Sequence, residues 1–470
     1  MVAIFLFHRD LRLRDNTTLI KAIESGTKIL PLFVFTPEQI DPKKNEHFSD
    51  HAVQYMCESL KDLDANLKQL GSKLTILYGD TCKVLTSLNK QLHIDSLYTN
   101  KDVSAYAVKR DAEIAKWCKN ENIPFISEED YGLLPLNVGL LSDGRPYKIL
   151  SQYYKNFLKI DLVRPVNKKT FKKIHFVSKD ANHINSLDWK TIDDFYITNP
   201  NQAMHGGRSD VKRILSNITN LKNYGVERDM LGKNGTSKAS AALKFGVLSI
   251  REFYWEIRGL YGKENDIIRQ LVFRDMYQKI FALNPELQKG VAYYDKIDKA
   301  IPWRYSKIEF ERWCKGETGF PLVDAGMREL NTTGWMHNRA RLVVSSFLSQ
   351  YLLIDWRWGA QYFSQKLIDG DIFNNTAGWM TNAAVFPNGA PYYRPPINPF
   401  LQSKKNDPNT EYILKWIPEL KGVTSRDIHH WYDIRSREKY PNITYKEPMI
   451  EQSVASHRAI DIFRKAYKNK

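Results

Sequence analysis

Tryptophan is concentrated in the second half of this sequence, and the placement of this residue type suggests chemistry. Nine of the eleven tryptophans follow residue 250: Trp255, Trp303, Trp313, Trp335, Trp356, Trp358, Trp379, Trp416 and Trp431. An indole ring can stack on a nucleobase, and it can also exchange electrons with a redox cofactor, because indole is among the more easily oxidised side chains. The alternative is a large helical core that uses the rings as filling.

The charge is divided unevenly along the chain. The net charge is +16, yet residues 1–130 hold 17 lysines and arginines against 19 aspartates and glutamates. The remaining 340 residues therefore carry a net charge of +18. This surplus predicts a surface that faces a polyanion, of which nucleic acid is the commonest for a basic protein. A lysine-rich coat that only confers solubility is the alternative.

Several common kinds of site are missing from the sequence. The four cysteines, at positions 57, 82, 118 and 314, form no CxxC pair, so we expect neither a disulfide framework nor a structural metal, and a reducing compartment such as the cytoplasm fits. Neither G-x-G-x-x-G nor G-x-x-x-x-G-K-[ST] occurs. No apolar run reaches the ~18 residues of a membrane span, so no membrane contact is expected.

The elements that must position these residues fall into two kinds. Short apolar runs at 2–7, 28–35, 74–78, 94–98 and 124–126 alternate with helical patterns at 16–24, 51–70, 81–92 and 105–119. This rhythm predicts an α/β domain over 1–130 with a doubly wound parallel sheet. Residues 131–204 have mixed composition and are predicted to form a long interdomain linker.

From residue 205 to 470 the apolar spacing is helical. Helices are expected at 211–221, 238–245, 250–260, 267–281, 310–314, 323–330 and 335–353. This half is therefore predicted to be an all-helical carboxy-terminal domain.

Four long segments carry a resemblance. They read FHRDLRLRDNTTL at 7–19, GTSKASAALKFGVLS at 235–249, GFPLVDAGMRELNTTGWMHNRAR at 319–341 and LLIDWRWGAQYFSQKLIDGDIFNNTAGW at 352–379. In this order, over nearly the whole chain, they resemble the photolyase/cryptochrome family, and most of all the class I photolyases of cyclobutane pyrimidine dimers. The resemblance implies that the helical domain binds FAD. The family's order of an α/β domain, a linker and a helical domain is the one that the residue patterns already predict.

The resemblance implies a set of FAD-binding residues. The family's tyrosine and TSxxS element, which hold the FAD phosphates, correspond to Tyr224, Thr236, Ser237, Lys238, Ala239 and Ser240. Hydroxyls and backbone N–H groups at a helix start make an anion site, although a simple helix cap has the same signature. The arginine–aspartate pair beside the flavin corresponds to Arg341 and Asp369, followed by Gly370 and Asp371. Asn338 is expected at both the cofactor and the DNA.

The resemblance also implies the electron-transfer residues. Asn375 matches the asparagine whose amide meets the reactive flavin nitrogen, and an amide can donate or accept there. A chain of three tryptophans corresponds to Trp379 nearest the flavin, then Trp356, then Trp303 at the surface. Trp313, Trp335 and Trp358 are expected to pack in the core.

The DNA-facing positions depart from the family pattern. The expected phosphate contacts, which give salt-dependent affinity, are Arg228, Arg274, Arg339 and Lys404. A lesion must be flipped into a pocket over the flavin, where class I enzymes use two tryptophans. Those positions are Phe273 and Thr381 here; Gln270 replaces a glutamate and Leu342 a methionine. Stacking is worth ~1–3 kcal/mol per base, and Tyr392 and Tyr393 are candidates to fill the space beside Thr381.

These residues predict light-driven repair of UV-damaged DNA. Photoexcited reduced FAD would donate an electron to a cyclobutane pyrimidine dimer, and the protein would supply orientation and electrostatics. The alternative is a cryptochrome-type blue-light photoreceptor without repair activity, and a third interpretation is a nucleic-acid-binding protein with a vestigial flavin site. The family habit predicts a monomer, in the cytoplasm and at the nucleoid if the source is bacterial.

Many family members hold a second, antenna chromophore: a folate, a deazaflavin or a flavin. Residues 100–111 resemble the antenna-side loop, but Tyr106 and Ala107 stand where a folate site would have asparagine and glutamate. Folate is therefore disfavoured, and the sequence leaves the identity of the antenna open.

Overall fold

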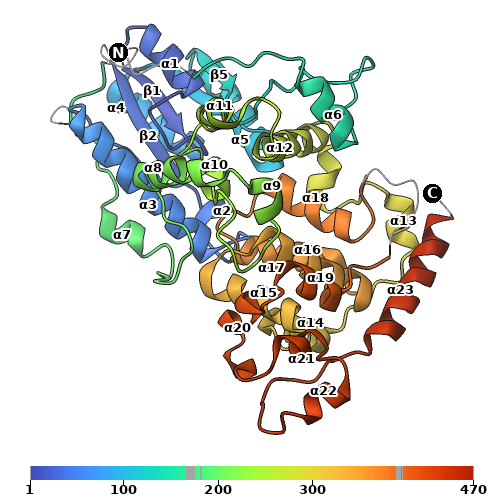
Figure 1. The fold of residues 1–470 in the computed structure, drawn as a ribbon. Coiled ribbons are helices and arrows are strands. Elements are labelled where there is room, and N and C mark those ends of the chain that lie inside the picture. The colour runs from blue at the N-terminus through green and yellow to red at the C-terminus, as the bar shows by residue number, and fades with distance from the viewer. Residues whose placement is uncertain (1, 166–174, 180–182, 388–392, 394, 469–470) are drawn as a thin grey trace.

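The computed structural model describes residues 2–165, 175–179, 183–387, 393 and 395–468 (Figure 1). A parallel sheet flanked by helices occupies the blue-to-cyan part of the chain, and helices make up nearly all of the green-to-red part. Helices α8, α10 and α11 lie next to the sheet domain, whereas α20, α21 and α22 lie at the far end of the molecule (Figure 1).

The sheet has five strands in the order β3-β2-β1-β4-β5, and every neighbouring pair is parallel. The strands are β1 (Val2–Phe7), β2 (Ile29–Phe35), β3 (Thr75–Tyr78), β4 (Ile94–Lys101) and β5 (Phe125–Glu129). In register, Ala3 pairs with Ile29 and Ile4 with Leu97. The prediction of a doubly wound parallel sheet is confirmed.

Helices cover both faces of this sheet. They are α1 (Thr17–Glu24), α2 (Pro37–Ile40), α3 (Asp50–Gln69), α4 (Thr81–Leu92) and α5 (Ala105–Asn120). Phe5 and Phe7 belong to one buried cluster, whereas Ile4 and Leu6 belong to another, because successive strand residues point to opposite faces. Burial on both sides explains why β1 is an unbroken apolar run rather than an alternating one.

The rest of the chain is helical. The helices are α6 (Leu150–Phe157), α7 (Trp189–Asp193), α8 (Arg208–Asn217), α9 (Tyr224–Glu227), α10 (Ser240–Lys244), α11 (Ile250–Tyr261), α12 (Asp266–Leu283), α13 (Asp295–Ala300), α14 (Lys307–Lys315), α15 (Pro321–Thr333), α16 (Asn338–Ser346), α17 (Trp356–Lys366), α18 (Ile372–Asn382), α19 (Pro399–Asn406), α20 (Glu411–Trp416), α21 (Ser425–His429), α22 (Ile434–Glu438) and α23 (Gln452–Tyr467). The all-helical second half is confirmed, while the division at residues 130 and 204 stays a prediction.

The helix expected over 335–353 is shorter than the pattern predicted. The Nδ1 atom of His337 accepts a hydrogen bond from the Arg339 backbone N–H at 3.1 Å, and this cap starts α16 at Asn338. The α-helix ends at Ser346 and continues as a π-helical turn over Phe347–Tyr351. Trp335 and Met336 therefore stand outside the helix, because a capping side chain overrides apolar spacing at the helix start.

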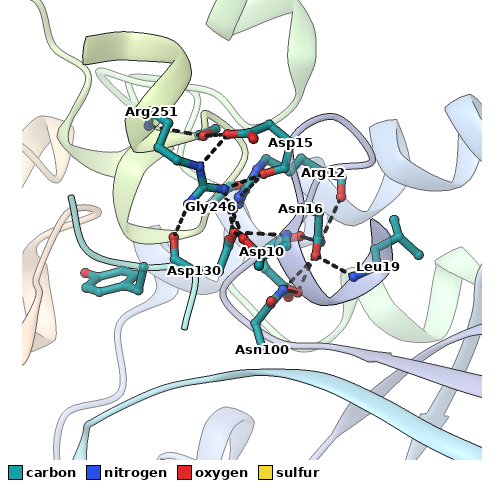
Figure 2. Close-up of polar contacts among 12 residues, drawn as sticks. Asp10, Arg12, Asp15, Asn16, Leu19, Asn100, Asp130, Gly246 and Arg251 are labelled. Carbon is teal, nitrogen blue, oxygen red and sulfur yellow. Dashed lines mark hydrogen bonds and ion pairs between the residues drawn. The ribbon is translucent and has the colours of Figure 1, made fainter. Parts of the chain in front are cut away.

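A buried charge network joins the sheet domain to the helices (Figure 2). Arg12 is ion-paired with Asp130, and Arg251 on α11 contacts Asp15 at 3.0 Å and Asp130 at 2.8 Å. Burial alone would raise the pKa of Asp130, but the two guanidinium groups outweigh it and lower that pKa. These contacts fix α11 against the carboxyl ends of the strands.

Gly246 lies at the same junction, directly after α10. Its φ is +64°, and a Cβ built there would stand 2.2 Å from the Arg9 carbonyl oxygen. Only glycine allows this close approach of the two backbones. Arg12 also donates to the Gly246 carbonyl at 3.0 Å, so the close contact is held by a buried hydrogen bond.

Candidate functional site

A cavity of about 530 Å³ lies among the helices of the second half. Its size falls within the usual range of small-molecule sites, roughly 300–1,000 Å³. Most residues predicted from the sequence for cofactor and lesion line it: Tyr224, Arg228, Thr236, Ser237, Lys238, Ala239, Ser240, Gln270, Phe273, Arg274, Asn338, Arg341, Leu342, Asp369, Gly370, Asp371, Asn375, Trp379 and Thr381. Segments far apart in sequence thus meet around one space.

Four predicted residues stand outside the cavity lining. Trp356 is buried and Trp303 is partly buried. A guanidinium nitrogen of Arg339 lies 2.6 Å from an Asp229 carboxylate oxygen. Lys404 is exposed on α19. Arg339 and Lys404 therefore do not line the cavity, and Arg339 is ion-paired with Asp229.

Arg341 and Asp369 form the predicted ion pair. One guanidinium nitrogen of Arg341 lies 3.0 Å from both carboxylate oxygens of Asp369, and Nε donates to the Met336 carbonyl at 2.8 Å. The loop before α16 therefore fixes the arginine, which in turn holds the aspartate at the cavity wall. A buried carboxylate needs such a partner, because burial penalises an unpaired charge.

Asp371 links the cavity to the sheet domain. It caps α18, accepts from the Tyr131 hydroxyl at 2.5 Å, and lies 3.2 Å from a guanidinium nitrogen of Arg9. Burial would raise its pKa, but Arg9, Arg274 and the Tyr131 hydroxyl outweigh burial and lower the pKa. Asp371 therefore contributes a fixed negative charge at the cavity wall.

Lys244 and Tyr131 line the cavity, and the sequence reasoning missed both. The ammonium of Lys244 donates to the Ile368 carbonyl at 2.9 Å. Burial lowers the pKa of Lys244 to about 8, although Asp369 and Asp371 oppose the shift. Lys244 lies inside the quoted segment 235–249, so its place in that motif was the available signal. Tyr131 follows β5, where the carboxyl end of a strand was the signal.

Arg274 is held inside the cavity rather than displayed on an outer surface. Its guanidinium lies 4.0 Å from the centre of the Tyr131 ring and donates to the Tyr131 carbonyl at 3.1 Å. Its second terminal nitrogen is buried and has no protein partner within the described chain. This arrangement offers a donor to a ligand in the cavity, and the contact of Arg274 with a DNA phosphate stays a prediction.

Trp379 forms part of the cavity wall and lies against an aromatic cluster. Its ring centroid lies 5.0 Å from that of Phe363 and 5.9 Å from that of Trp313. Gly359 makes room for it, since a Cβ at Gly359 would stand 2.1 Å from the indole. Trp313 was expected to pack in the core, and it does so directly against Trp379.

Asn375 and Gly378 lie on one helix, α18, beside Trp379. The amide nitrogen of Asn375 donates to the Ala360 carbonyl at 2.9 Å, which orients the side chain and uses only one of its two N–H donors. A Cβ at Gly378 would meet no atom within 4 Å, although Gly378 lines the cavity. The missing side chain leaves open space for a flat ligand beside the asparagine.

The polar segment 236–240 lies at another part of the lining. Ser237 Oγ accepts from the Ala239 backbone N–H at 3.4 Å, and Lys238 Nζ lies 5.0 Å from the centre of the Trp335 ring. Helix α10 begins at Ser240 and has only five residues. An anion at this segment would therefore contact hydroxyls, loop N–H groups and Lys238. The dipole of a long helix would contribute little, in contrast to the helix-start site predicted from the sequence.

The lesion-side residues form an aromatic pair on α12. The ring centroids of Phe273 and Tyr277 are 4.5 Å apart, and Tyr277 also bonds the Thr381 hydroxyl. Tyr277 lines the cavity and lies beside Thr381, in the space for which Tyr392 and Tyr393 were the predicted candidates. Tyr393 does not fill it, because its hydroxyl bonds Gln350 at 2.6 Å and its ring stacks on Phe463. Tyr392 lies outside the described residues.

The fold and the cavity together define a class of protein. An α/β domain is joined to a helical domain whose cavity combines hydroxyls, cations, an unpartnered guanidinium donor and an open face beside an amide. This set fits a flavin dinucleotide, with anion-binding groups for its phosphates and an aromatic, amide-bearing end for its ring system. The residues present thus fit FAD.

Comparisons with known proteins agree with this class. Residues 3–170 match the family described as DNA photolyase, and residues 267–465 match the FAD-binding domain of DNA photolyase. A deoxyribodipyrimidine photo-lyase of Alkalihalophilus pseudofirmus is 32% identical, with 97% of each chain covered. The chain belongs to the DNA photolyase family, and its helical half is an FAD-binding domain.

Two solved structures share the whole fold. An archaeal photolyase from Sulfolobus tokodaii, solved with two FAD molecules, has a TM-score of 0.85 and 31% identity and is covered over 100% of both chains. A cryptochrome from Synechocystis has a TM-score of 0.87 and 26% identity, with 99% of both chains covered. Within the described residues no helix is long and apolar enough to cross a membrane.

Proposed function

We propose that this protein repairs cyclobutane pyrimidine dimers in DNA with the energy of near-UV or blue light. One observation carries the proposal: residues that the family uses for FAD and residues that it uses for the lesion line the same cavity, although they come from segments far apart in sequence. When bound and reduced, FAD would supply the light-excited electron that splits the dimer. Everything else is the work of binding and orientation.

On the cofactor side, the proposed roles follow from charge. Lys238 and the hydroxyls of 236–240 would hold the phosphates of FAD. Arg341 would keep Asp369 in place, and Asn375 would meet the flavin edge with an amide already oriented by Ala360. Trp379 at the wall would start the electron route through Trp356 to Trp303.

On the DNA side, Phe273 and Tyr277 would stack on the flipped bases, and Gln270 and Asn338 would offer hydrogen bonds to the lesion. Arg228, Arg274, Arg339 and Lys404 would contact the DNA phosphates. Two aromatic rings on one helix differ from the two-tryptophan arrangement of class I enzymes. The proposal therefore includes an altered preference among pyrimidine dimers.

The deciding experiment is a light-dependent repair assay. Purified holoprotein is reduced chemically, mixed with an oligonucleotide that carries a thymine dimer, and illuminated, while the absorbance of intact thymines is followed. We expect recovery only when light and reduction are combined. Absence of recovery from protein that holds photoreducible FAD would reject repair of this lesion.

A photoreceptor without repair activity is the second candidate. The loss of an aromatic residue at Thr381 favours it, as does the likeness to a cryptochrome structure. A negative repair assay together with normal flavin photochemistry would support this candidate. Tight binding of dimer-containing DNA would instead favour repair of a different lesion.

We also propose a second, light-harvesting chromophore. The archaeal structural relative was solved with two FAD molecules, which implied a novel light-harvesting cofactor. In this chain the Tyr106 hydroxyl shares a hydrogen bond of 2.8 Å with Thr36 on the antenna side. Mass spectrometry of the extracted cofactors, per mole of protein, would identify the chromophore as a flavin, a deazaflavin or a folate.

We propose a monomeric form that acts on DNA in the cytoplasm, at the nucleoid of a bacterial cell. The excess of positive charge after residue 130 supports a DNA partner. Size-exclusion chromatography with light scattering would test the monomer, and a dimer mass would reject it.

A further inference from the structure

The side chain of Asp298, on α13, joins two of the tryptophans in the proposed electron route. The indole N–H of Trp356 donates to Asp298 Oδ1 at 3.0 Å. The indole N–H of Trp303 is shared between the same oxygen and the backbone carbonyl of Asp298, each at 3.1 Å. The two indole nitrogens are therefore no farther apart than two hydrogen-bond lengths. One carboxylate oxygen thus contacts both indoles, and the backbone carbonyl of the same residue also holds Trp303.

Asp298 is buried, and its other carboxylate oxygen is paired with a cation. Its side chain is 6% exposed, and Oδ2 lies 2.5 Å from a guanidinium nitrogen of Arg357. Arg357 is itself fixed by the Gly290 carbonyl and by Asp355, at 2.8 and 3.0 Å. This partner offsets part of the cost of burying the carboxylate.

The position of the charge matters because electron transfer leaves an indole positively charged. A carboxylate at hydrogen-bond distance stabilises that positive charge, and the N–H bond to it becomes stronger. The effect is larger at a buried site, where water does not screen it. Arg357 acts in the opposite direction on Trp356, because its guanidinium carbon lies 4.6 Å from the centre of that ring.

We propose that Asp298 is a positioning residue that holds Trp356 and Trp303 together and makes both easier to oxidise by one electron. The inference rests on the proposed function, since it concerns the route that would keep FAD reduced. When Trp379 has lost an electron, Trp356 replaces it and is oxidised, and Trp303 then reduces Trp356. A thiol in solution returns one electron to Trp303 and is itself oxidised. The indole protons stay on their nitrogens throughout.

The first test is the rate of light-driven FAD reduction in the holoprotein, with a thiol present. Asp298→Asn keeps an acceptor oxygen and nearly the same volume but removes the charge. We expect reduction to slow by roughly tenfold, the effect of weakening a hydrogen bond to a charged group. Asp295→Asn is the matched control, because Asp295 lies on the same helix, is 43% exposed and pairs only with Lys299 among the charge partners described. An unchanged rate in Asp298→Asn would overturn the proposal.

The second readout does not require light or a bound cofactor. Tryptophan labelled with nitrogen-15 gives one indole N–H signal per residue, and Trp303→Phe and Trp356→Phe assign the two signals concerned. Both signals should shift in Asp298→Asn and stay in place in Asp295→Asn. Signals that do not move would refute the shared contact. Shifted signals with an unchanged reduction rate would leave Asp298 a purely structural role and reject its effect on oxidation.

A variant with the opposite expected effect on the reduction rate covers the case in which Asp298→Asn does not fold. Arg357→Gln keeps the carboxylate and removes the cation over the Trp356 ring, so we expect faster reduction; an equal or slower rate would overturn the proposal. Repair by wild-type protein that has been reduced chemically does not depend on this route. Failure of that assay would count against the proposed repair function, whereas the rates of the variants report on Asp298.

Discussion

The charged side chains of the cavity wall are held by partners before any ligand enters. Arg341 pairs with Asp369, and Asp371 accepts from Tyr131 beside Arg9. Lys244 faces both carboxylates and donates to a backbone carbonyl. Preorganisation of this kind lowers the cost of binding, because few side chains must be reordered when the cofactor arrives.

The Arg341–Asp369 pair should matter for cofactor affinity. Asp369→Asn removes the charge that holds the guanidinium, and a hydrogen bond to a charged group is worth about 1.5–3 kcal/mol. We expect the dissociation constant for FAD to rise roughly tenfold or more, measured by flavin fluorescence in titrations of the apoprotein. Asp433→Asn, which breaks a pair with exposed Arg435, should leave the constant unchanged. Equal affinity in both variants would contradict this role.

Phe273 should contribute to recognition of damaged rather than intact DNA. Phe273→Ala removes one ring of the pair on α12, and stacking is worth ~1–3 kcal/mol per base. The dissociation constant for a dimer-containing oligonucleotide should rise about tenfold in a fluorescence anisotropy assay, with little change for undamaged DNA. Tyr432→Ala, at a ring that is 50% exposed and outside the cavity lining, serves as the control. A parallel loss for both kinds of DNA would assign Phe273 to general affinity.

At the scale of elements, the junction between the sheet and α11 relies on charge rather than on apolar packing alone. Two arginines, Arg12 and Arg251, surround Asp130 just after β5 (Figure 2). This junction fixes the position of Gly246 and of α10, and therefore of the polar segment 236–240 that lines the cavity. A loss of charge at Asp130 should therefore affect the stability of the fold.

Asp130→Asn should lower the free energy of unfolding by about 3–5 kcal/mol at neutral pH, because it leaves buried arginines without their partner. The pKa of Asp130 is lowered in the folded protein. Its contribution is thus present above the ordinary carboxyl pKa of about 4 and is lost as pH falls through the folded value. Urea unfolding of wild type and variant should differ most at neutral pH and converge in acid. Asp143→Asn, at an exposed pair with Arg145, should show no such difference.

At the scale of the whole molecule, the net positive charge is carried by the residues after 130. Such a distribution attracts a polyanion to one part of the protein while the sheet domain stays nearly neutral. Exposed Lys404 on α19 is one of the cations that can act in this way. The affinity for DNA should therefore fall as salt concentration rises.

The salt dependence can be assigned to single cations. Lys404→Gln should weaken binding to damaged and undamaged DNA alike and reduce the slope of log affinity against log salt by about one. Lys119→Gln, at an exposed lysine on α5 of the sheet domain, should leave the slope unchanged. Anisotropy titrations at several salt concentrations measure both. If the slope of Lys404→Gln equals that of wild type, Lys404 makes no phosphate contact.

Much of the fold follows from local patterns in the chain. Strands β1 and β2 are continuous apolar runs because both faces of the sheet are covered, and the long helices of the second half keep regular apolar spacing. The resemblance also indicated which residues would surround a common space, and nineteen of the residues predicted for the cofactor, the damaged DNA and the electron route line the cavity. Local patterns failed at the start of α16, where the His337 cap ends the apparent helix before Asn338.

The tertiary structure decided which residues actually meet. No spacing in the sequence indicates that Asp298 accepts from two indoles, that Tyr277 occupies the space beside Thr381, or that Arg274 turns toward Tyr131. The physical reason is that hydrogen bonds, ring contacts and burial depend on distances between elements, whereas composition and periodicity describe one element at a time. The sequence by itself therefore determined the fold class, the family and most of the cavity lining, and only the packed molecule determined how its charges and rings are paired.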